Sequence, residues 1–331
     1  MSYWNKVVIF AGVIMAFCFA LPTNCPAPLV WRKGEGWAYE RHGITTAKNP
    51  KEQLDYAREL QSKKQFGDAV TAYRRLIRRW PTAFAVEEGR LGLAECLSQV
   101  GYHFKAFQEY QNLITKHPNT KHFELAMERE LEIGNKFLNG ERHKVFGLKI
   151  FPGLEKSIEV FEQIVKNAPY GKYGPLAQFQ LGQVYEKQKE YLSAVHAYEK
   201  ILERYPDDPM AEKAQFQIGL AYRKESARAE YDQNAANQAI TAFTDFATRF
   251  PRSENVAKAD QYRVALREEQ SRGLFHIAQF YEKNKTYKAA LIYYNEVIAQ
   301  NPKSEWAANA QKKILQIKQL EERKSAAAPT K

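Results

Sequence analysis

One stretch, residues 175–206, constrains the fold of this chain more than any other. Its sequence is PLAQFQLGQVYEKQKEYLSAVHAYEKILERYP. Two small residues, Gly182 and Ala194, lie where two helix backbones can approach closely, and Pro206 ends the second helix. The large residues Leu181, Tyr185 and Tyr198 fill the seam between the helices. The stretch therefore predicts an antiparallel pair of amphipathic helices, which cannot bury its apolar face without neighbours of the same kind.

The same order of small, small, aromatic and proline residues recurs along the chain. Regularly spaced sets are Ala57/Ala69/Tyr73/Pro81, Ala94/Ala106/Tyr110/Pro118 and Ala278/Ala290/Tyr294/Pro302. Two further sets are stretched, namely Gly134/Ser157/Phe161/Pro169 and Gly219/Ala239/Phe243/Pro251. They have roughly eleven and roughly eight extra residues between their two helices, by the period rule for helical repeats. This order is typical of tetratricopeptide repeats, in which each unit is a helical hairpin.

The sequence thus predicts an all-α fold, a tetratricopeptide-repeat superhelix (α-solenoid) with about six helical hairpins and a C-terminal capping helix. The predicted repeats cover about 50–81, 82–118, 119–169, 170–206, 207–251 and 252–302. The capping helix is expected at 305–323, and a disordered tail at 324–331.

Composition narrows the class of partner. The 331 residues are 44% hydrophobic and 26% charged, as in a folded soluble protein, and the net charge is +11. The basic residues are scattered over predicted helix faces, as in Arg74-Arg75, and no RNP-like, zinc-finger or basic-zipper pattern is found. We therefore expect protein partners, with association at a membrane surface left open, and neither nucleic acid nor a small-molecule substrate.

The amino terminus predicts export. Lys6 precedes an apolar run over residues 7–20, and Pro22 ends it. This order is typical of a signal peptide covering 1–20, although an uncleaved anchor is the alternative. In both interpretations, the repeats are exported across a membrane. Lipidation at Cys25 is possible but disfavoured, because Asn24 and Pro22 stand where lipoproteins carry a small residue and leucine.

Residues 21–49 are predicted to be irregular. Trp31, Trp37 and Tyr39 within them are large to leave in water. They either cover the apolar end of the first repeat or form a docking peptide for a partner.

The chain contains no recognisable catalytic motif. Its seven histidines show no metal-binding spacing, and neither a nucleophile elbow nor a phosphate loop is present. The sequence predicts no catalytic, cofactor or metal residues, so an enzyme is the remote alternative.

Two regions are candidate contact sites. Counting from Ala57 and Ala94, the inner face of the first two repeats should present Leu54, Arg58, Gln61, Leu91, Glu95 and Ser98. This mixture suits an extended or helical peptide. The insertion at 140–153 carries Val145, Phe146, Leu148, Ile150 and Phe151. This apolar loop either folds back over its own hairpin or contacts a partner or membrane surface.

The last unit resembles the final repeat of the BamD family, the tetratricopeptide component of the bacterial machinery that assembles outer-membrane proteins. The similarity lies in Ile277-Ala278-Gln279-Phe280-Tyr281 and Tyr287-Lys288-Ala289-Ala290. The stretch FGDAVTAYRRLIRRWP is similar to the start of that family. The resemblance extends over residues 50–320. BamD proteins carry fewer repeats and a lipid-bearing cysteine.

The resemblance implies a non-catalytic periplasmic adaptor associated with the outer membrane. Its N-terminal repeats would engage unfolded outer-membrane protein clients, and its C-terminal repeats would dock on a BamA-like insertase. The alternative is a periplasmic coordinator of cell-envelope and cell-division work of the Tol-Pal-associated type. The absence of a heptad run before the repeats counts against that alternative.

Overall fold

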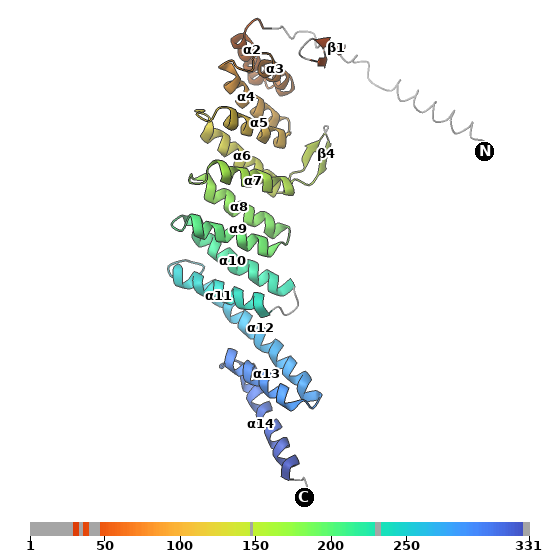
Figure 1. Ribbon diagram of the computed structural model, residues 1–331, viewed down its shortest axis with the longest axis vertical. Helices are drawn as coiled ribbons and strands as arrows, with labels where there is room; N and C mark the ends of the chain where they lie inside the picture. The colour runs from red at the N-terminus through yellow and green to blue at the C-terminus, as the bar shows by residue number, and fades with distance from the viewer. Residues whose placement is uncertain (1–28, 33–35, 40–46, 146–147, 229–232, 327–331) are drawn as a thin grey trace, which may run out of the picture. The chain divides into compact units, whose positions relative to one another are not determined.

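The computed structural model describes residues 29–32, 36–39, 47–145, 148–228 and 233–326. The predicted signal peptide at 1–20 and Cys25 lie outside the described residues. Among the described residues there are six helical hairpins and a closing helix, which confirms the predicted all-α tetratricopeptide-repeat solenoid (Figure 1).

The helices follow one another in pairs. They are α2 (Pro50–Ser62) and α3 (Phe66–Arg79), α4 (Ala85–Gln99) and α5 (His103–Lys116), α6 (Phe123–Leu138) and α7 (Leu154–Asn167), α8 (Tyr173–Lys187) and α9 (Tyr191–Arg204), α10 (Pro209–Arg228) and α11 (Gln233–Arg249), α12 (Val256–Lys283) and α13 (Tyr287–Gln300), then α14 (Glu305–Ala326).

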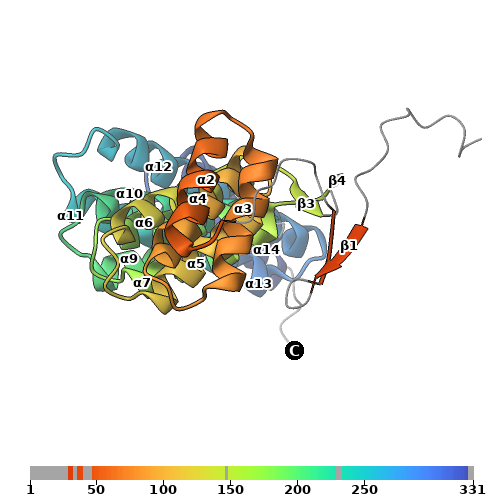
Figure 2. The ribbon, with the colours of Figure 1, turned by 90° about the horizontal axis from the view of Figure 1, so that it is seen from above.

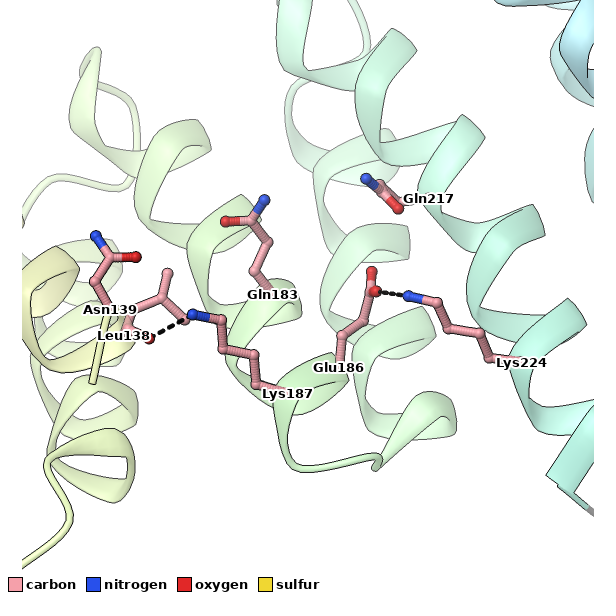
Figure 3. Close-up of a pocket in the computed structure, with 7 residues that line it drawn as sticks. All are labelled: Leu138, Asn139, Gln183, Glu186, Lys187, Gln217 and Lys224. Atoms are coloured by element: carbon pink, nitrogen blue, oxygen red, sulfur yellow. Dashed lines mark hydrogen bonds and ion pairs between the residues drawn. The ribbon is translucent and has the colours of Figure 1, made fainter.

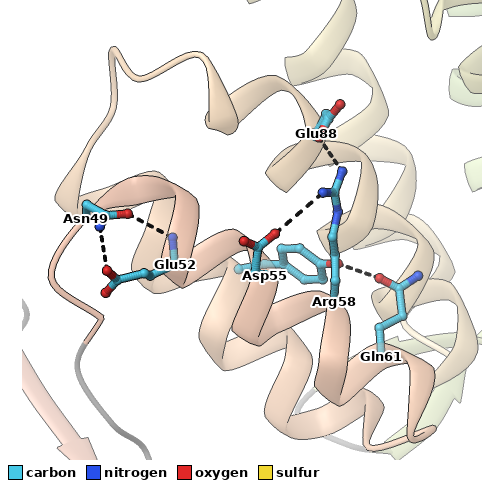
Figure 4. Close-up of polar contacts among 7 residues, drawn as sticks. Asn49, Glu52, Asp55, Arg58, Gln61 and Glu88 are labelled. Carbon is cyan, nitrogen blue, oxygen red and sulfur yellow. Dashed lines mark hydrogen bonds and ion pairs between the residues drawn. The ribbon is translucent and has the colours of Figure 1, made fainter.

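The helices belong to two compact units. Helices α2, α3 and α4 with residues 109–120 form the first unit. Residues 102–108 and the chain from Lys121 onward form the second. The first unit begins with a capped helix, because the side chain of Asn49 accepts from the backbone N–H of Glu52 at 2.9 Å (Figure 4). The second unit contains the larger core.

Close contact between paired helices depends on glycine in the second unit. A Cβ at Gly182 would lie 2.3 Å from the ring of Tyr198, and one at Gly219 would lie 2.6 Å from the ring of Phe243. Both rings are buried. The glycine in the first helix therefore makes room for the aromatic residue of the second helix, as the sequence pattern predicts.

Successive hairpins share their cores. In the second unit, the second helix of one hairpin packs on the first helix of the next. Val195 and Ile201 of α9 thus lie in one buried cluster with Ile218 and Ala221 of α10. This arrangement buries the apolar face that a single hairpin would leave exposed.

Two short hairpins of strands interrupt the helical pattern. Strand β1 (Leu29–Arg32) pairs antiparallel with β2 (Gly36–Tyr39), where the sequence predicted irregular chain. Valine, tryptophan and tyrosine favour strands, which accounts for the difference.

The insertion between α6 and α7 forms the second pair of strands. Strand β3 (His143–Val145) pairs antiparallel with β4 (Leu148–Phe151), and the register shifts between His143 and Lys144. This hairpin extends to one side of α6 and α7 (Figures 1 and 2). Of the candidate contact loop, Phe146 and the side chains of Val145, Leu148, Ile150 and Phe151 lie outside the described residues.

Candidate functional site

A groove crosses the first helices of three successive hairpins in the second unit. Its volume is about 370 Å³. Its lining residues are Leu138 and Asn139 at the end of α6, Gln183, Glu186 and Lys187 of α8, and Gln217 and Lys224 of α10 (Figure 3).

Helix geometry explains why α8 contributes three side chains to this groove. Gln183, Glu186 and Lys187 are spaced three and four residues apart, so they share one face of the helix. A different face of α8 carries Leu181 and Gly182, which are buried against neighbouring helices. One helix thus supplies both a core face and a groove face.

Glu186 is the most connected polar residue in the groove. It accepts a hydrogen bond of 2.8 Å from the hydroxyl of Tyr198 and forms an ion pair with Lys224 (Figure 3). Burial, with a further contribution from the Glu186 carboxylate, raises the pKa of Tyr198 far above its usual range. Tyr198 therefore stays neutral and keeps Glu186 in position.

Lys187 is held at the other side of the groove. Its Nζ donates to the backbone carbonyl of Leu138 at 2.6 Å, at the C-terminal end of α6 (Figure 3). A cation is favourable there because the last carbonyls of a helix carry partial negative charge. The contact ties α8 to α6 and fixes the width of this end of the groove.

Three amide side chains complete the lining. Within the described part of the chain, Asn139, Gln183 and Gln217 make no side-chain hydrogen bond with another residue. Gln183 of α8 and Gln217 of α10 are half-buried (Figure 3). Each amide can both donate and accept, which matches the N–H and C=O groups of a peptide backbone.

Three of the residues predicted to face a groove in the first unit lie close together. Gln61 donates to the carboxylate of Glu95 at 2.9 Å and accepts from the hydroxyl of Tyr73 at 2.6 Å. Arg58 forms an ion pair with Glu88 (Figure 4). The structure thus brings Arg58, Gln61 and Glu95 together on the faces of α2 and α4.

The other predicted groove residues lie elsewhere. Leu54 is only 5% exposed and belongs to the core, because it lies one turn before the buried Ala57 on α2. Leu54 is therefore a core residue, and its predicted place in the groove is wrong. Leu91 and Ser98 are half-buried on α4.

Comparison with known proteins places the chain in a family. The family model described as YfiO, outer membrane lipoprotein, matches residues 153–328, which is more than half of the chain. The chain belongs to the YfiO outer membrane lipoprotein family. This confirms the resemblance to BamD-like proteins. The matched region includes α8, α10 and the last repeat, and therefore most of the groove in the second unit.

Several solved structures are similar in part. The C-terminal part of a tetratricopeptide protein from Cytophaga hutchinsonii is 16% identical, with 80% of this chain and 88% of that chain covered and a TM-score of 0.36. A protein from Parabacteroides merdae is 12% identical, with 81% and 100% covered and a TM-score of 0.34. No curated protein matches the chain.

The YfiO family and the repeat fold establish a scaffold for protein interactions. Families of this type are typically non-catalytic. Within the described residues, no group of three or more His, Cys, Asp or Glu side chains is arranged to hold a metal ion. In the same part of the chain, no helix is both long and apolar enough to cross a membrane.

The sequence predictions missed most of the groove in the second unit. They placed the groove residues in the first two repeats and did not extend the count to later repeats. Glu186 follows Gly182 at the spacing that separates Gln61 from Ala57, while Lys187 and Lys224 follow their glycines by one residue more. Counting four and five residues onward from the small residue of every repeat would have found them.

Proposed function

We propose that this YfiO-family chain is a non-catalytic periplasmic adaptor that helps outer-membrane β-barrel proteins to assemble and insert. In this proposal, the groove across α6, α8 and α10 holds an extended segment of an unfolded client. The observation that carries the proposal is the set of amides, Asn139, Gln183 and Gln217, which face the groove without side-chain partners among the described residues.

An extended client offers one N–H and one C=O group at every residue. Amide side chains can bind these groups whatever the client sequence, which suits an adaptor for many β-barrel proteins. The Glu186–Lys224 pair and the Lys187 contact fix the helices that carry the amides. Because the groove is preformed, little conformational entropy of the scaffold is lost on binding.

The last repeat supports docking on a BamA-like insertase, as the family resemblance implies. Ile292 of α13 and Leu315 of α14 are large apolar residues that remain mostly exposed. Exposed apolar side chains on a folded protein often mark a contact with another protein. Client binding and insertase docking would thus use different hairpins of the second unit.

The proposal includes export to the periplasm and association with the outer membrane. The family description supports an envelope location. Mass spectrometry of the mature amino terminus distinguishes cleavage after the predicted signal, a retained anchor and a lipid on Cys25. An intact, unexported chain would contradict the periplasmic location.

A binding experiment tests the groove. The probe is a fluorescent synthetic peptide that copies one transmembrane strand of an outer-membrane β-barrel protein. We expect a double variant, Gln183→Leu with Gln217→Leu, to bind at least about tenfold more weakly, since two backbone-matching amides are lost. The control is Gln279→Leu, an exposed amide on α12 outside the groove, which should bind as the wild type does. Equal affinities of the double variant and the control would refute the groove assignment.

A second experiment tests the partner. The protein is purified from its native envelope in mild detergent, and the co-purifying proteins are identified. A BamA-like insertase supports the assembly role. Recovery of Tol-Pal components without an insertase would instead favour the role in envelope constriction.

A further inference from the structure

The hairpins stack through a recurring pair of apolar positions. The pair is defined relative to the small residue of the first helix: one member lies just before it and the other lies two places after it. In three hairpins, both members are at most 6% exposed. These pairs are Leu93 with Cys96, Leu181 with Val184, and Ile218 with Ala221. The second helix of the preceding hairpin lies against the helix that carries each pair.

The last hairpin has the same pair but leaves it uncovered. Around Ala278, Ile277 is 39% exposed and Phe280 is 61% exposed. Residues of the type that is buried elsewhere therefore face solvent on α12. Two exposed apolar side chains on one helix face are unusual at a position that serves for stacking.

The length of α12 explains the difference. The preceding helix, α11, packs on the first part of α12, where Ala259 and Leu266 lie in one cluster with Phe243 (Figure 1). Near the start of α11, Asn237 accepts a hydrogen bond of 2.8 Å from Gln270. Ile277 lies two turns further along α12, about 10 Å beyond that contact at 1.5 Å per residue.

Phe280 continues a stripe of residues whose first members pack against α11. Ala259, Leu266, Gly273 and Phe280 follow one another at intervals of seven residues, so they lie along one side of α12. The early part of this stripe is buried, and its last member, Phe280, is exposed. The uncovered face is thus an extension of a helix–helix interface.

We propose that this face, formed by Ile277 and Phe280, binds an amphipathic α-helix of a partner protein. The helix lies where the second helix of a preceding hairpin lies on α4, α8 and α10. The fold itself shows what covers such a surface, since α9 covers the equivalent Ile218 and Ala221 of α10. This docking site is separate from the client groove and stands without it.

The side chains of the face indicate what the partner helix carries. Phe280 replaces the smaller Cys96, Val184 and Ala221 of the other hairpins. A helix that packs over it therefore needs a small residue opposite the ring and larger apolar residues on either side.

The test uses a helix from this chain as the probe. A fluorescent peptide with the sequence of α9, YLSAVHAYEKILER, is titrated against the full chain and its anisotropy is measured. We expect saturable binding that is at least about tenfold weaker for Phe280→Glu, because a charge cannot be buried there without a partner. Leu192→Glu, at a residue 59% exposed on another hairpin, should bind as the wild type does.

Two further measurements make the result specific. A peptide with Ala194→Pro should not bind, because proline prevents the helix. The groove variant Gln183→Leu with Gln217→Leu should bind the helical peptide normally, which separates this site from the client groove. Unchanged circular dichroism and melting temperature of Phe280→Glu exclude unfolding as the cause.

Other outcomes overturn the proposal. Binding that does not saturate, or that is equal for Phe280→Glu and the control, shows that this face is no helix site. If the wild type is a dimer by light scattering and Phe280→Glu is a monomer, a second copy of the chain covers the face, and the partner-helix proposal is wrong.

Discussion

Substitution of Gly182 by alanine tests the packing rule on which the second unit depends. The added Cβ would lie 2.3 Å from Cε1 and 2.5 Å from Cζ of Tyr198. Real Cβ atoms essentially never approach this closely. The Tyr198 ring is completely buried and its hydroxyl is bonded to Glu186 at 2.8 Å, so it cannot move aside freely. The helices α8 and α9 must therefore separate.

The expected magnitude combines two opposing effects. Forcing an extra carbon into a packed core costs about 1–3 kcal/mol. Replacing glycine by alanine within a helix raises the free energy of unfolding by about 0.5–1 kcal/mol, because alanine has the higher helix propensity. The net destabilisation therefore lies between about 0 and 2.5 kcal/mol, and it is about 1 kcal/mol at the middle of the two ranges. Gly67→Ala is the matched control, because no atom lies within 4 Å of its added Cβ. Without a clash, the control should gain up to about 0.5–1 kcal/mol.

Urea unfolding followed by circular dichroism measures both variants, with hydrogen exchange to locate the effect. Exchange should become faster in α8 and α9 of Gly182→Ala, because a repeat protein can loosen locally. A groove carried by α8 should also bind client peptide less well. If Gly182→Ala were as stable as Gly67→Ala, the close approach of α8 to Tyr198 would be refuted.

Three further outcomes are expected. Lys189 has a φ of +62°, a left-handed conformation that favours glycine. Lys189→Gly should therefore raise the free energy of unfolding by up to about 1 kcal/mol, and a lower urea midpoint would contradict this. Burial raises the pKa of Tyr198 and of Tyr294 above the ordinary value near 10. Tyrosines of the unfolded chain ionise first as pH rises, so the contribution of these two tyrosines to stability is fully present below about pH 10 and falls above it. Thermal melting from pH 9 to 12 should therefore show a falling melting temperature. The fall should be smaller for the double Tyr→Phe variant. Gln178 donates to the carbonyl of Ala197 at 2.9 Å inside the core, so Gln178→Leu should cost about 1 kcal/mol in urea unfolding, and an unchanged midpoint would argue against this bond.

The sequence predicts the hairpins because their contacts are local and repeated. A glycine or alanine in the first helix requires an aromatic residue at a fixed distance in the second, as Gly182 and Tyr198 show. The turn between those helices was harder to foresee. Lys189 adopts the left-handed conformation there, and lysine gives no sequence signal for it.

Spacing along one helix is enough to predict some side-chain contacts of the first unit. Arg58 and Gln61 meet carboxylates of α4, since residues three apart on α2 lie on the same face. Leu54 was misplaced because it lies three residues before Ala57 and shares the buried side of α2. Lys187 bonds a backbone carbonyl of α6, a contact that side-chain spacing does not reveal.

The sequence pattern does not predict that one face of α12 is exposed, and the reason is physical. Ile277 and Phe280 occupy the positions of residues that are buried in other hairpins, so the sequence marks them as core. Their exposure depends on the length of α12, which carries Ala278 beyond the reach of α11. Lengthening one helix by a few turns thus changes a stacking surface into a binding surface without changing the type of residue on it. In a repeat protein, a new contact site can therefore arise from the spacing between repeats alone, and burial must be compared between equivalent positions to find it.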